Sequence, residues 1–315
     1  MPRHVLPESS VSLLRAVGVG AAGHALFFRH GAPLLALPPD REVALSTAGL
    51  YLPQSLRAKA AAGALRALCR AGLHVAALPR LPGEPDGTGA LFCNPDHGSR
   101  AVVVKRGTGG ALRVVKAARP EDGAPVEKEH AALSRFRGVP GVPETGPLCR
   151  TDGAVSFDMP YLPPAPRGAD PAPLLAAWDS GRQEPAAGNG LVKSLLPLLD
   201  SGARAEIGAA TVRRALVHGD FAPWNWRAAP DGRGIVCIDW EWAREDGFAG
   251  FDLAYCLVQT AILVRRAPEA RLLRETRRAA AALPGAARGI LEGCGLGLET
   301  LVALATAYRK TKGRT

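Results

Sequence analysis

Residues 216–252 read LVHGDFAPWNWRAAPDGRGIVCIDWEWAREDGFAGFD, and four of the chain's five tryptophans lie within them. Two short apolar runs in this stretch each end at an acidic residue, Asp220 after a His-Gly pair and Asp239 directly. The sequence DGRG (231–234) is typical of a turn. The pattern predicts a hairpin that places Asp220 and Asp239 at neighbouring strand ends, with Asn225 on the same loop as Asp220.

These residue types suit phosphoryl transfer. That reaction needs a divalent metal on the phosphates, a group that orients the attacking hydroxyl and accepts its proton, and in-line positioning. One Asp with one Asn is a suitable oxygen ligand set for Mg²⁺, which keeps several waters and needs few protein ligands. A second Asp that the metal does not neutralise can accept the proton.

The pattern HGD-x4-N, followed by IDWE and then DLA, resembles the aminoglycoside phosphotransferase / choline kinase superfamily, a relative of the protein kinases. Variants of HGDF-x-PWN occur in family members from polysaccharide and lipopolysaccharide gene neighbourhoods. The resemblance implies that Asp220 is the catalytic aspartate and that Asn225 and Asp239 bind the metal. It further implies that Asp252 helps to hold the catalytic loop and that His218 makes structural hydrogen bonds.

The resemblance covers about residues 90–260. It implies that Lys116, at the end of a strand, binds phosphate, with Glu129 of the next helix as its ion-pair partner and Glu127 as the alternative. The strand at 155–162 resembles the hinge strand that binds adenine, and residues 97–99, between the first two strands of the N-lobe, lie where the family has its nucleotide loop. The nucleotide-binding residues implied by these two segments are His97, Gly98, Ser99, Met159, Tyr161 and Leu162.

Three residues of the catalytic segment depart from the commonest family pattern, namely Ala222, Trp224 and Trp226. They bear on the identity of the acceptor, because the residues implied in metal chemistry are all present. Trp224 and Glu241 are the candidates for contact with the acceptor. The alternatives are that Trp224 packs in the core, the commoner use of tryptophan, and that Glu241 is a surface carboxylate.

The composition is that of a folded globular protein, with 315 residues, 22% charged and 47% hydrophobic residues. The net charge of +10 is spread along the chain, which argues against a nucleic-acid-binding patch. The basic residues of 265–278 and 309–314 form either solvated helix faces or a surface for an anionic acceptor or membrane. Six cysteines without a CxxC pair, and no long uncharged apolar run, predict a cytoplasmic protein with no transmembrane segment.

Apolar periodicity predicts an α+β protein, and the resemblance implies the two-lobed, protein-kinase-like fold. The expected domains are an N-terminal α/β extension at 1–89, a β-rich N-lobe at 90–162 and a mainly helical C-lobe at 163–315. The expected strands are 24–28, 33–37, 43–50, 90–93, 101–105, 112–116 and 154–161. The expected helices are 55–73, 124–136, 171–178, 192–199, 204–216 and two or three more after residue 252.

The sequence therefore predicts a phosphotransferase that uses ATP and Mg²⁺ to phosphorylate a hydroxyl of a small molecule, sugar or glycan. An aminoglycoside or a choline-like amino alcohol is the alternative acceptor, and GTP an alternative donor. A nucleotide-binding pseudokinase scaffold is a non-catalytic alternative, although it usually lacks one of the catalytic residues. A binder of RNA or of membrane surfaces is a further alternative, which the even charge distribution disfavours.

Overall fold

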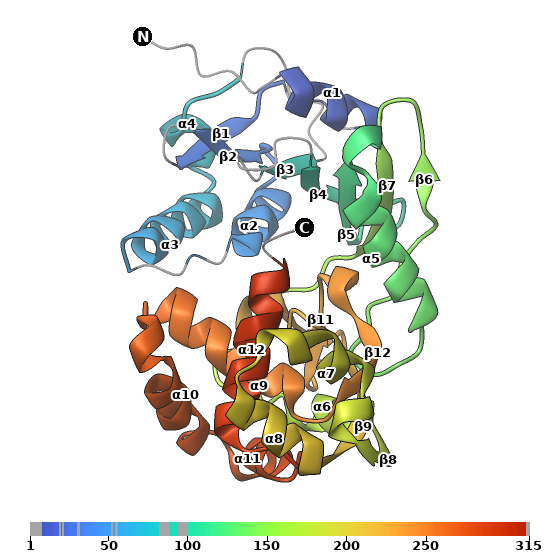
Figure 1. The fold of residues 1–315 in the computed structure, drawn as a ribbon. Coiled ribbons are helices and arrows are strands. Elements are labelled where there is room, and N and C mark those ends of the chain that lie inside the picture. The colour runs from blue at the N-terminus through green and yellow to red at the C-terminus, as the bar shows by residue number, and fades with distance from the viewer. Residues whose placement is uncertain are drawn as a thin grey trace. The chain divides into compact units, whose positions relative to one another are not determined.

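The computed structural model describes residues 8–18, 20, 22–29, 32–51, 53, 56–81, 89–93 and 100–312. The chain divides into two compact units. Unit 1 comprises residues 1–137 and 143–164, and unit 2 comprises residues 138–142 and 165–315. Unit 1 is built on a β-sheet and unit 2 is mainly helical, so the predicted α+β class is confirmed (Figure 1).

The described strands of unit 1 form one antiparallel sheet in the order β1-β2-β3-β4-β5-β7-β6. These strands are β1 (Ala25–Arg29), β2 (Ala32–Leu37), β3 (Gly89–Cys93), β4 (Arg100–Arg106), β5 (Leu112–Ala118), β6 (Cys149–Arg150) and β7 (Val155–Pro160). The described part of residues 1–89 thus contributes β1 and β2 to the sheet that also holds the strands predicted for the N-lobe.

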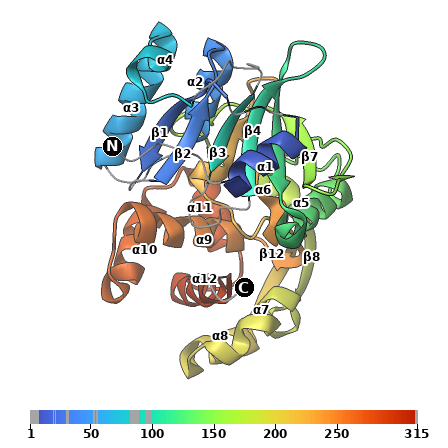
Figure 2. The same cartoon turned by 90° about the horizontal axis from the view of Figure 1, so that it is seen from above.

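Both faces of the β1–β2 end of this sheet are covered by helices (Figure 2). The helices of unit 1 are α1 (Glu8–Ala16), α2 (Arg41–Leu50), α3 (Leu56–Ala71), α4 (His74–Ala77) and α5 (Ala124–Arg135). Leu26 of β1 packs with Leu13 and Leu14 of α1 in one cluster. Its neighbour Ala25 belongs to a second cluster, with Ala48 of α2. Successive residues of a strand point to opposite faces, so an apolar strand here buries both sides.

The strand predicted at 43–50 is wrong, because this segment is the helix α2. The carboxylate of Asp40 accepts the backbone N–H groups of Glu42 (2.9 Å) and Val43 (3.0 Å) and so caps the first turn. The buried residues of the run include Val43, Ala44, Thr47 and Ala48, which share one face of a helix. The short apolar run fits a strand or a helix, and the cap together with burial on one face decides for the helix.

Unit 2 contains a three-stranded sheet in the order β12-β9-β8 and a separate hairpin β10–β11 among its described residues. The strands are β8 (Asp179–Pro185), β9 (Thr211–Val217), β10 (Trp226–Ala228), β11 (Ile235–Cys237) and β12 (Arg244–Phe248). The helices are α6 (Ala172–Trp178), α7 (Gly190–Leu195), α8 (Ser201–Ala209), α9 (Phe251–Gln259), α10 (Leu272–Ala281), α11 (Gly285–Glu292) and α12 (Leu298–Lys312). No helix in the described ranges of the chain is long and apolar enough to span a bilayer.

Two expectations for unit 2 are wrong in detail. The helix predicted at 204–216 ends with α8 at Ala209, and the chain continues as β9, the central strand of its sheet. The predicted hairpin between the two apolar runs does not form, because β11 pairs with β10 and β9 pairs with β8 and β12. The turn at 231–234 is present but closes onto the strand immediately before it, which is the shorter loop to close.

We expect Asp40→Ala to lower the free energy of unfolding by about 1 kcal/mol, because it removes the cap of α2. Asp40 also accepts hydrogen bonds from Arg106 Nε (2.9 Å) and Nη2 (3.2 Å), and loss of this partly exposed pair adds about 0.2–1 kcal/mol to the cost. The measurement is urea denaturation of the full chain, with Asp122→Ala as the control because Asp122 is exposed in the same unit. Equal midpoints for the two variants would contradict the capping role.

Candidate functional site

The catalytic segment predicted at 218–220 is held by a buried carboxylate, Asp252, in the first turn of α9. Its two oxygens accept the backbone N–H groups of His218 (2.6 Å) and Gly219 (3.0 Å). Burial raises the pKa of Asp252 to about 7, whereas the two backbone donors favour the carboxylate form. Asp252 therefore holds the backbone of this loop through two hydrogen bonds.

The His218 ring forms hydrogen bonds both to Asp220 and to the residue that precedes Asp239. Its Nε2 donates to the carbonyl of Ile238 (2.9 Å), and its Nδ1 accepts the backbone N–H of Asp220 (3.1 Å). These two partners require a neutral ring with the proton on Nε2. The ring is fully buried against Trp240, and burial lowers the pKa of His218 to about 4. His218 is thus a structural hydrogen-bonding residue here.

Asp220 is surrounded by polar partners from three elements. Its Oδ2 accepts the side-chain amide of Asn225 (3.0 Å), and its Oδ1 accepts the hydroxyl of Tyr255 (3.1 Å) and the ammonium of Lys312 (2.7 Å). Asn225 is buried and also donates to the Asp220 carbonyl (2.9 Å). Because Asn225 uses its nitrogen for these bonds, its oxygen, the atom that a metal would need, stays outside them.

Asp239 lies beside this group, one residue after Ile238. The backbone N–H of Ile238 donates to the Asn225 carbonyl (3.0 Å), and the negative charges of Asp220 and Asp239 both act on His218 and Lys312. Asp239 has a left-handed backbone conformation (φ 66°), which is uncommon outside glycine and recurs at functional sites. Asp220, Asn225 and Asp239 are therefore brought together without the predicted hairpin.

The oxygen atoms of Asn225 and Asp239 suit Mg²⁺ better than they suit a transition metal. Within the described ranges, no group of three or more His, Cys, Asp or Glu side chains is arranged to hold a metal ion. One carboxylate from Asp239 and one amide oxygen from Asn225 are hard oxygen donors. Such a sparse set suits a cation that keeps most of its waters and binds substrate phosphates.

Two side chains that contact Asp220 are absent from the candidates that the sequence offers, namely Tyr255 and Lys312. Lys312 stands among the basic residues of the C-terminal segment, 92 positions from Asp220. The structure buries most of its side chain, and the Nζ lies 5.0 Å from the ring centre of Trp242 and 5.3 Å from that of Tyr255. Burial lowers the pKa of Lys312, and the charge of Asp220 opposes this shift. No local motif could have indicated this contact, because it depends on how α12 packs.

The tryptophans of residues 216–252 have different surroundings, because some pack in the core and others lie near the candidate site. Trp240 is fully buried and contacts the rings of His218 and Trp178, which is a packing role. Trp224, a candidate acceptor contact, is only partly buried. Glu241, the other candidate, accepts the indole N–H of Trp242 (3.0 Å), and its charge acts on Lys312. Glu241 is thus close enough to Lys312 for its negative charge to raise the pKa of that lysine.

In unit 1, the Nζ of Lys116 lies 2.6 Å and 2.7 Å from the two carboxylate oxygens of Glu129. Both side chains are buried, with Lys116 on β5 between β4 and β7, and Glu129 on α5. The alternative, Glu127, instead accepts Arg150 Nε (2.8 Å) at a more exposed position. The structure thereby selects Glu129 as the partner of Lys116.

The predicted hinge residues lie at the end of β7. Met159 and Leu162 are buried, whereas Tyr161 is partly buried and donates its hydroxyl to the Ser46 carbonyl of α2 (3.3 Å). The backbone N–H of Tyr161 donates to the Leu112 carbonyl (3.0 Å), which extends the β5–β7 pairing by one bond. The predicted nucleotide-loop residues His97, Gly98 and Ser99 lie outside the described residues.

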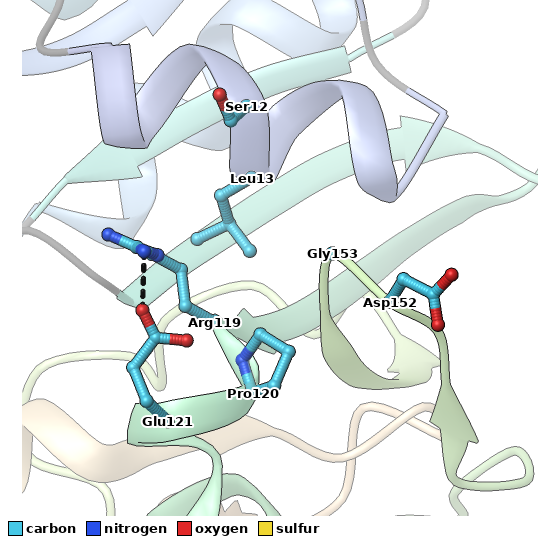
Figure 3. A pocket seen from close by; sticks show the side chains of 7 residues that line it. All are labelled: Ser12, Leu13, Arg119, Pro120, Glu121, Asp152 and Gly153. Carbon is cyan, nitrogen blue, oxygen red and sulfur yellow. Dashed lines mark ion pairs between the residues drawn. The ribbon is translucent and has the colours of Figure 1, made fainter.

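A separate pocket of about 410 Å³ lies in unit 1 between α1 and the turn before β7 (Figure 3). It is lined by Ser12, Leu13, Arg119, Pro120, Glu121, Asp152 and Gly153. Arg119 and Glu121 form an ion pair with each other on its rim. The pocket contains none of the predicted site residues, and it is not part of the candidate site.

The model of the phosphotransferase enzyme family matches residues 44–290. The chain belongs to this family. The match spans most of the chain and both units, so the predicted enzyme class, a phosphotransferase, is confirmed. A comparison with curated proteins finds no significant match.

Among solved structures, this phosphotransferase is similar to the aminoglycoside phosphotransferase APH(4)-Ia, with 14% identity and a TM-score of 0.43, over 71% of this chain and 87% of that one. It is also similar to a type I macrolide 2'-phosphotransferase, with 17% identity and a TM-score of 0.41, over 74% and 86%. A third similar structure is the macrolide 2'-phosphotransferase MphH from Brachybacterium faecium, with 18% identity and a TM-score of 0.38, over 70% and 83%.

Gly219 gives a test of how tightly the loop of this phosphotransferase is packed. Gly219 has a left-handed conformation (φ +74°), and a Cβ there would lie 2.3 Å from the Trp242 carbonyl and 2.6 Å from the Tyr308 hydroxyl. Gly232 has a similar conformation (φ +71°) but open space around it. We expect Gly232→Ala to cost about 1–2 kcal/mol for the backbone alone. Gly219→Ala should cost about 1–3 kcal/mol more because of the clash.

The measurement is the free energy of unfolding of the two variants by chemical denaturation, with near-ultraviolet circular dichroism to follow the tryptophans of the site. Equal destabilisation of the two variants would contradict the close approach at Gly219.

Proposed function

We propose that this phosphotransferase moves the γ-phosphoryl group of ATP to a hydroxyl of a sugar, glycan or similar small molecule. The observation that carries the proposal is the arrangement around Asp220, whose carboxylate is fixed beside the Asn225 amide and close to Asp239. This set combines a proton acceptor with oxygen ligands for a divalent cation, which are the parts that phosphoryl transfer requires.

Each residue has a distinct role in this proposal. Asp220 accepts the hydrogen bond of the attacking hydroxyl, orients its oxygen and takes its proton as the new P–O bond forms and the bond from the γ-phosphorus to the leaving ADP oxygen breaks. Asn225 and Asp239 hold Mg²⁺, which when bound neutralises charge on the phosphates. Lys116 binds phosphate oxygens, and Glu129 positions its ammonium through the buried ion pair. Loop positions are set by Asp252 and His218.

For the nucleotide, we propose that adenine is bound by the end of β7, from Met159 to Leu162, and that His97, Gly98 and Ser99 approach the phosphates. Related structures of APH(4)-Ia variants were solved with AMP-PNP and hygromycin B and with ADP and hygromycin B. The described cysteines Cys69, Cys149, Cys237, Cys256 and Cys294 are free thiols, in keeping with the cytoplasm, where ATP is abundant.

The acceptor proposal follows from charge. The chain carries a net charge of +10, and a lysine ammonium already neutralises Asp220. Polycationic acceptors favour acidic sites, so we propose a neutral or anionic sugar or glycan hydroxyl as the acceptor. Trp224 offers a partly buried ring on which a sugar face can pack, and Glu241 offers a hydrogen-bond acceptor for sugar hydroxyls.

We expect Asp220→Ala to lower kcat at least about 100-fold, because general-base contributions are about 10²–10⁴-fold, and to leave the Kd of Mg-ATP within a few-fold. The assay is Mg²⁺-dependent ADP release over a panel of neutral sugars, acidic sugars, glycolipids, aminoglycosides and amino alcohols, together with calorimetry of Mg-ATP binding. Asp231→Ala is the matched control, because Asp231 is an exposed carboxylate in the β10–β11 turn.

Two results would contradict this assignment. One is an Asp220→Ala variant that turns over at the wild-type rate, since Asp220 would then not take part in the reaction. The other is loss of Mg-ATP binding in that variant with unchanged turnover at saturating nucleotide, which would make Asp220 a nucleotide-binding residue.

A further inference from the structure

The side chains around Asp220 form a cage for an ammonium group. Its carboxylate wall is Asp220, and its aromatic walls are Trp242 and Tyr255, whose ring centres lie 5.0 Å and 5.3 Å from the bound cation. Both distances are within the range of cation–π attraction. The charges of Asp239 and Glu241 add to the negative potential. The cation that fills this cage is the chain's own Lys312.

We infer that Lys312 is a specificity-determining residue that occupies this ammonium site permanently and so excludes acceptors with an amine beside the reacting hydroxyl. The inference rests on the proposed function, because it takes Asp220 as the residue that the acceptor hydroxyl must approach. The acceptor then carries neutral or anionic groups at the positions next to that hydroxyl.

The ammonium of Lys312 has acceptors for each of its protons. A lysine has three N–H donors, and the Nζ lies 2.7 Å from Asp220 Oδ1, 3.2 Å from the Gly219 carbonyl and 3.4 Å from the Tyr255 hydroxyl. Gln259 Nε2 donates to the Tyr255 hydroxyl, which leaves that hydroxyl's own proton for Asp220. The cage is thus complete without a ligand, and Lys312 is matched to it in charge and in hydrogen bonding.

Lys312 is kept in the cage by the packing of α12. The helix lies beside α9 (Figure 1), and its buried face includes Leu301, Leu304 and Tyr308. The Tyr308 ring packs against the rings of Phe251 and Tyr255, and its hydroxyl donates to the Trp242 carbonyl (3.4 Å). To displace Lys312, an acceptor amine would have to unfold the last turn of α12 or push a buried cation aside. Either change costs energy that a neutral acceptor does not need to supply.

Lys312 also limits which groups can approach the remaining lone pair of the Asp220 carboxylate. The Asn225 amide occupies Oδ2, and Lys312 with Tyr255 occupies Oδ1. An uncharged hydroxyl can donate to Oδ2 beside the Asn225 amide, since a carboxylate oxygen has two lone pairs and both of those on Oδ1 are used. A second ammonium at that place would meet the Lys312 charge at close range, and like-charge contact is unfavourable.

The first experiment measures amine binding without any phosphoryl transfer. The probe is n-butylammonium, which reproduces the end of a lysine side chain, titrated by NMR and by tryptophan fluorescence. We expect Lys312→Ala to bind it at least tenfold more tightly than wild type, because the emptied cage accepts the amine. Lys310→Ala is the control, since Lys310 is exposed and pairs with Glu269 on the surface. Equal Kd values for wild type and Lys312→Ala would overturn the inference.

The second experiment measures acceptor choice at a pH where a sugar amine is protonated, with glucosamine and N-acetylglucosamine as the matched probes. Wild type should favour the neutral sugar in kcat/KM at least tenfold, and Lys312→Met, which keeps the apolar stem, should lower this ratio at least tenfold. An unchanged ratio would overturn the inference. If neither sugar is phosphorylated, the amine-binding arm decides alone, and if Lys312→Ala does not fold, butylammonium binding to Lys312→Met decides. The phosphotransferase proposal itself is judged separately, by Asp220→Ala.

Discussion

The loop that carries Asp220 is held by one buried carboxylate. Asp252, at the N-terminal turn of α9, accepts the backbone N–H groups of His218 and Gly219 and so turns the chain away from β9. The helix N-terminus and the two donors favour the negative charge, which offsets part of the cost of burying it. Because Gly219 adopts a left-handed conformation against the Trp242 carbonyl, the next residue, Asp220, has little freedom in where it points. A mobile loop would have to become ordered in each turnover, and the fixed backbone avoids that entropic cost.

The second constraint is the connection between the two acidic segments. It is made by the His218 ring, which bonds both Asp220 and Ile238, and by the backbone contact from Ile238 to Asn225. In unit 1, the buried ion pair of Lys116 and Glu129 likewise fixes the position of a polar side chain. Buried ion pairs contribute little net stability, so such a pair is better explained by a need to place a charge than by a need to hold a fold.

Sequence reasoning succeeded where the signal was local. Helix and strand periodicity located most elements. The pattern of the catalytic segment pointed to Asp220, Asn225 and Asp239, which lie together in unit 2, and the resemblance pointed to Lys116 and Glu129, which form an ion pair in unit 1. It failed where tertiary context decides. A short apolar run became α2 because of the Asp40 cap, and the segment after α8 became β9 because it pairs with two strands. The contact of Lys312 with Asp220 could not be predicted at all, since it depends on the packing of α12 against α9.

The central proposal is that Asn225 and Asp239 hold the metal and that Lys116 binds phosphate oxygens. A crystal structure of the full chain with Mn²⁺ and AMP-PNP tests this most directly, because the anomalous signal of Mn²⁺ locates the metal without ambiguity. The account predicts Mn²⁺ bound by the Asn225 side-chain oxygen and the Asp239 carboxylate, with Lys116 in contact with phosphate oxygens. A nucleotide complex in which Mn²⁺ contacts neither Asn225 nor Asp239 would contradict it.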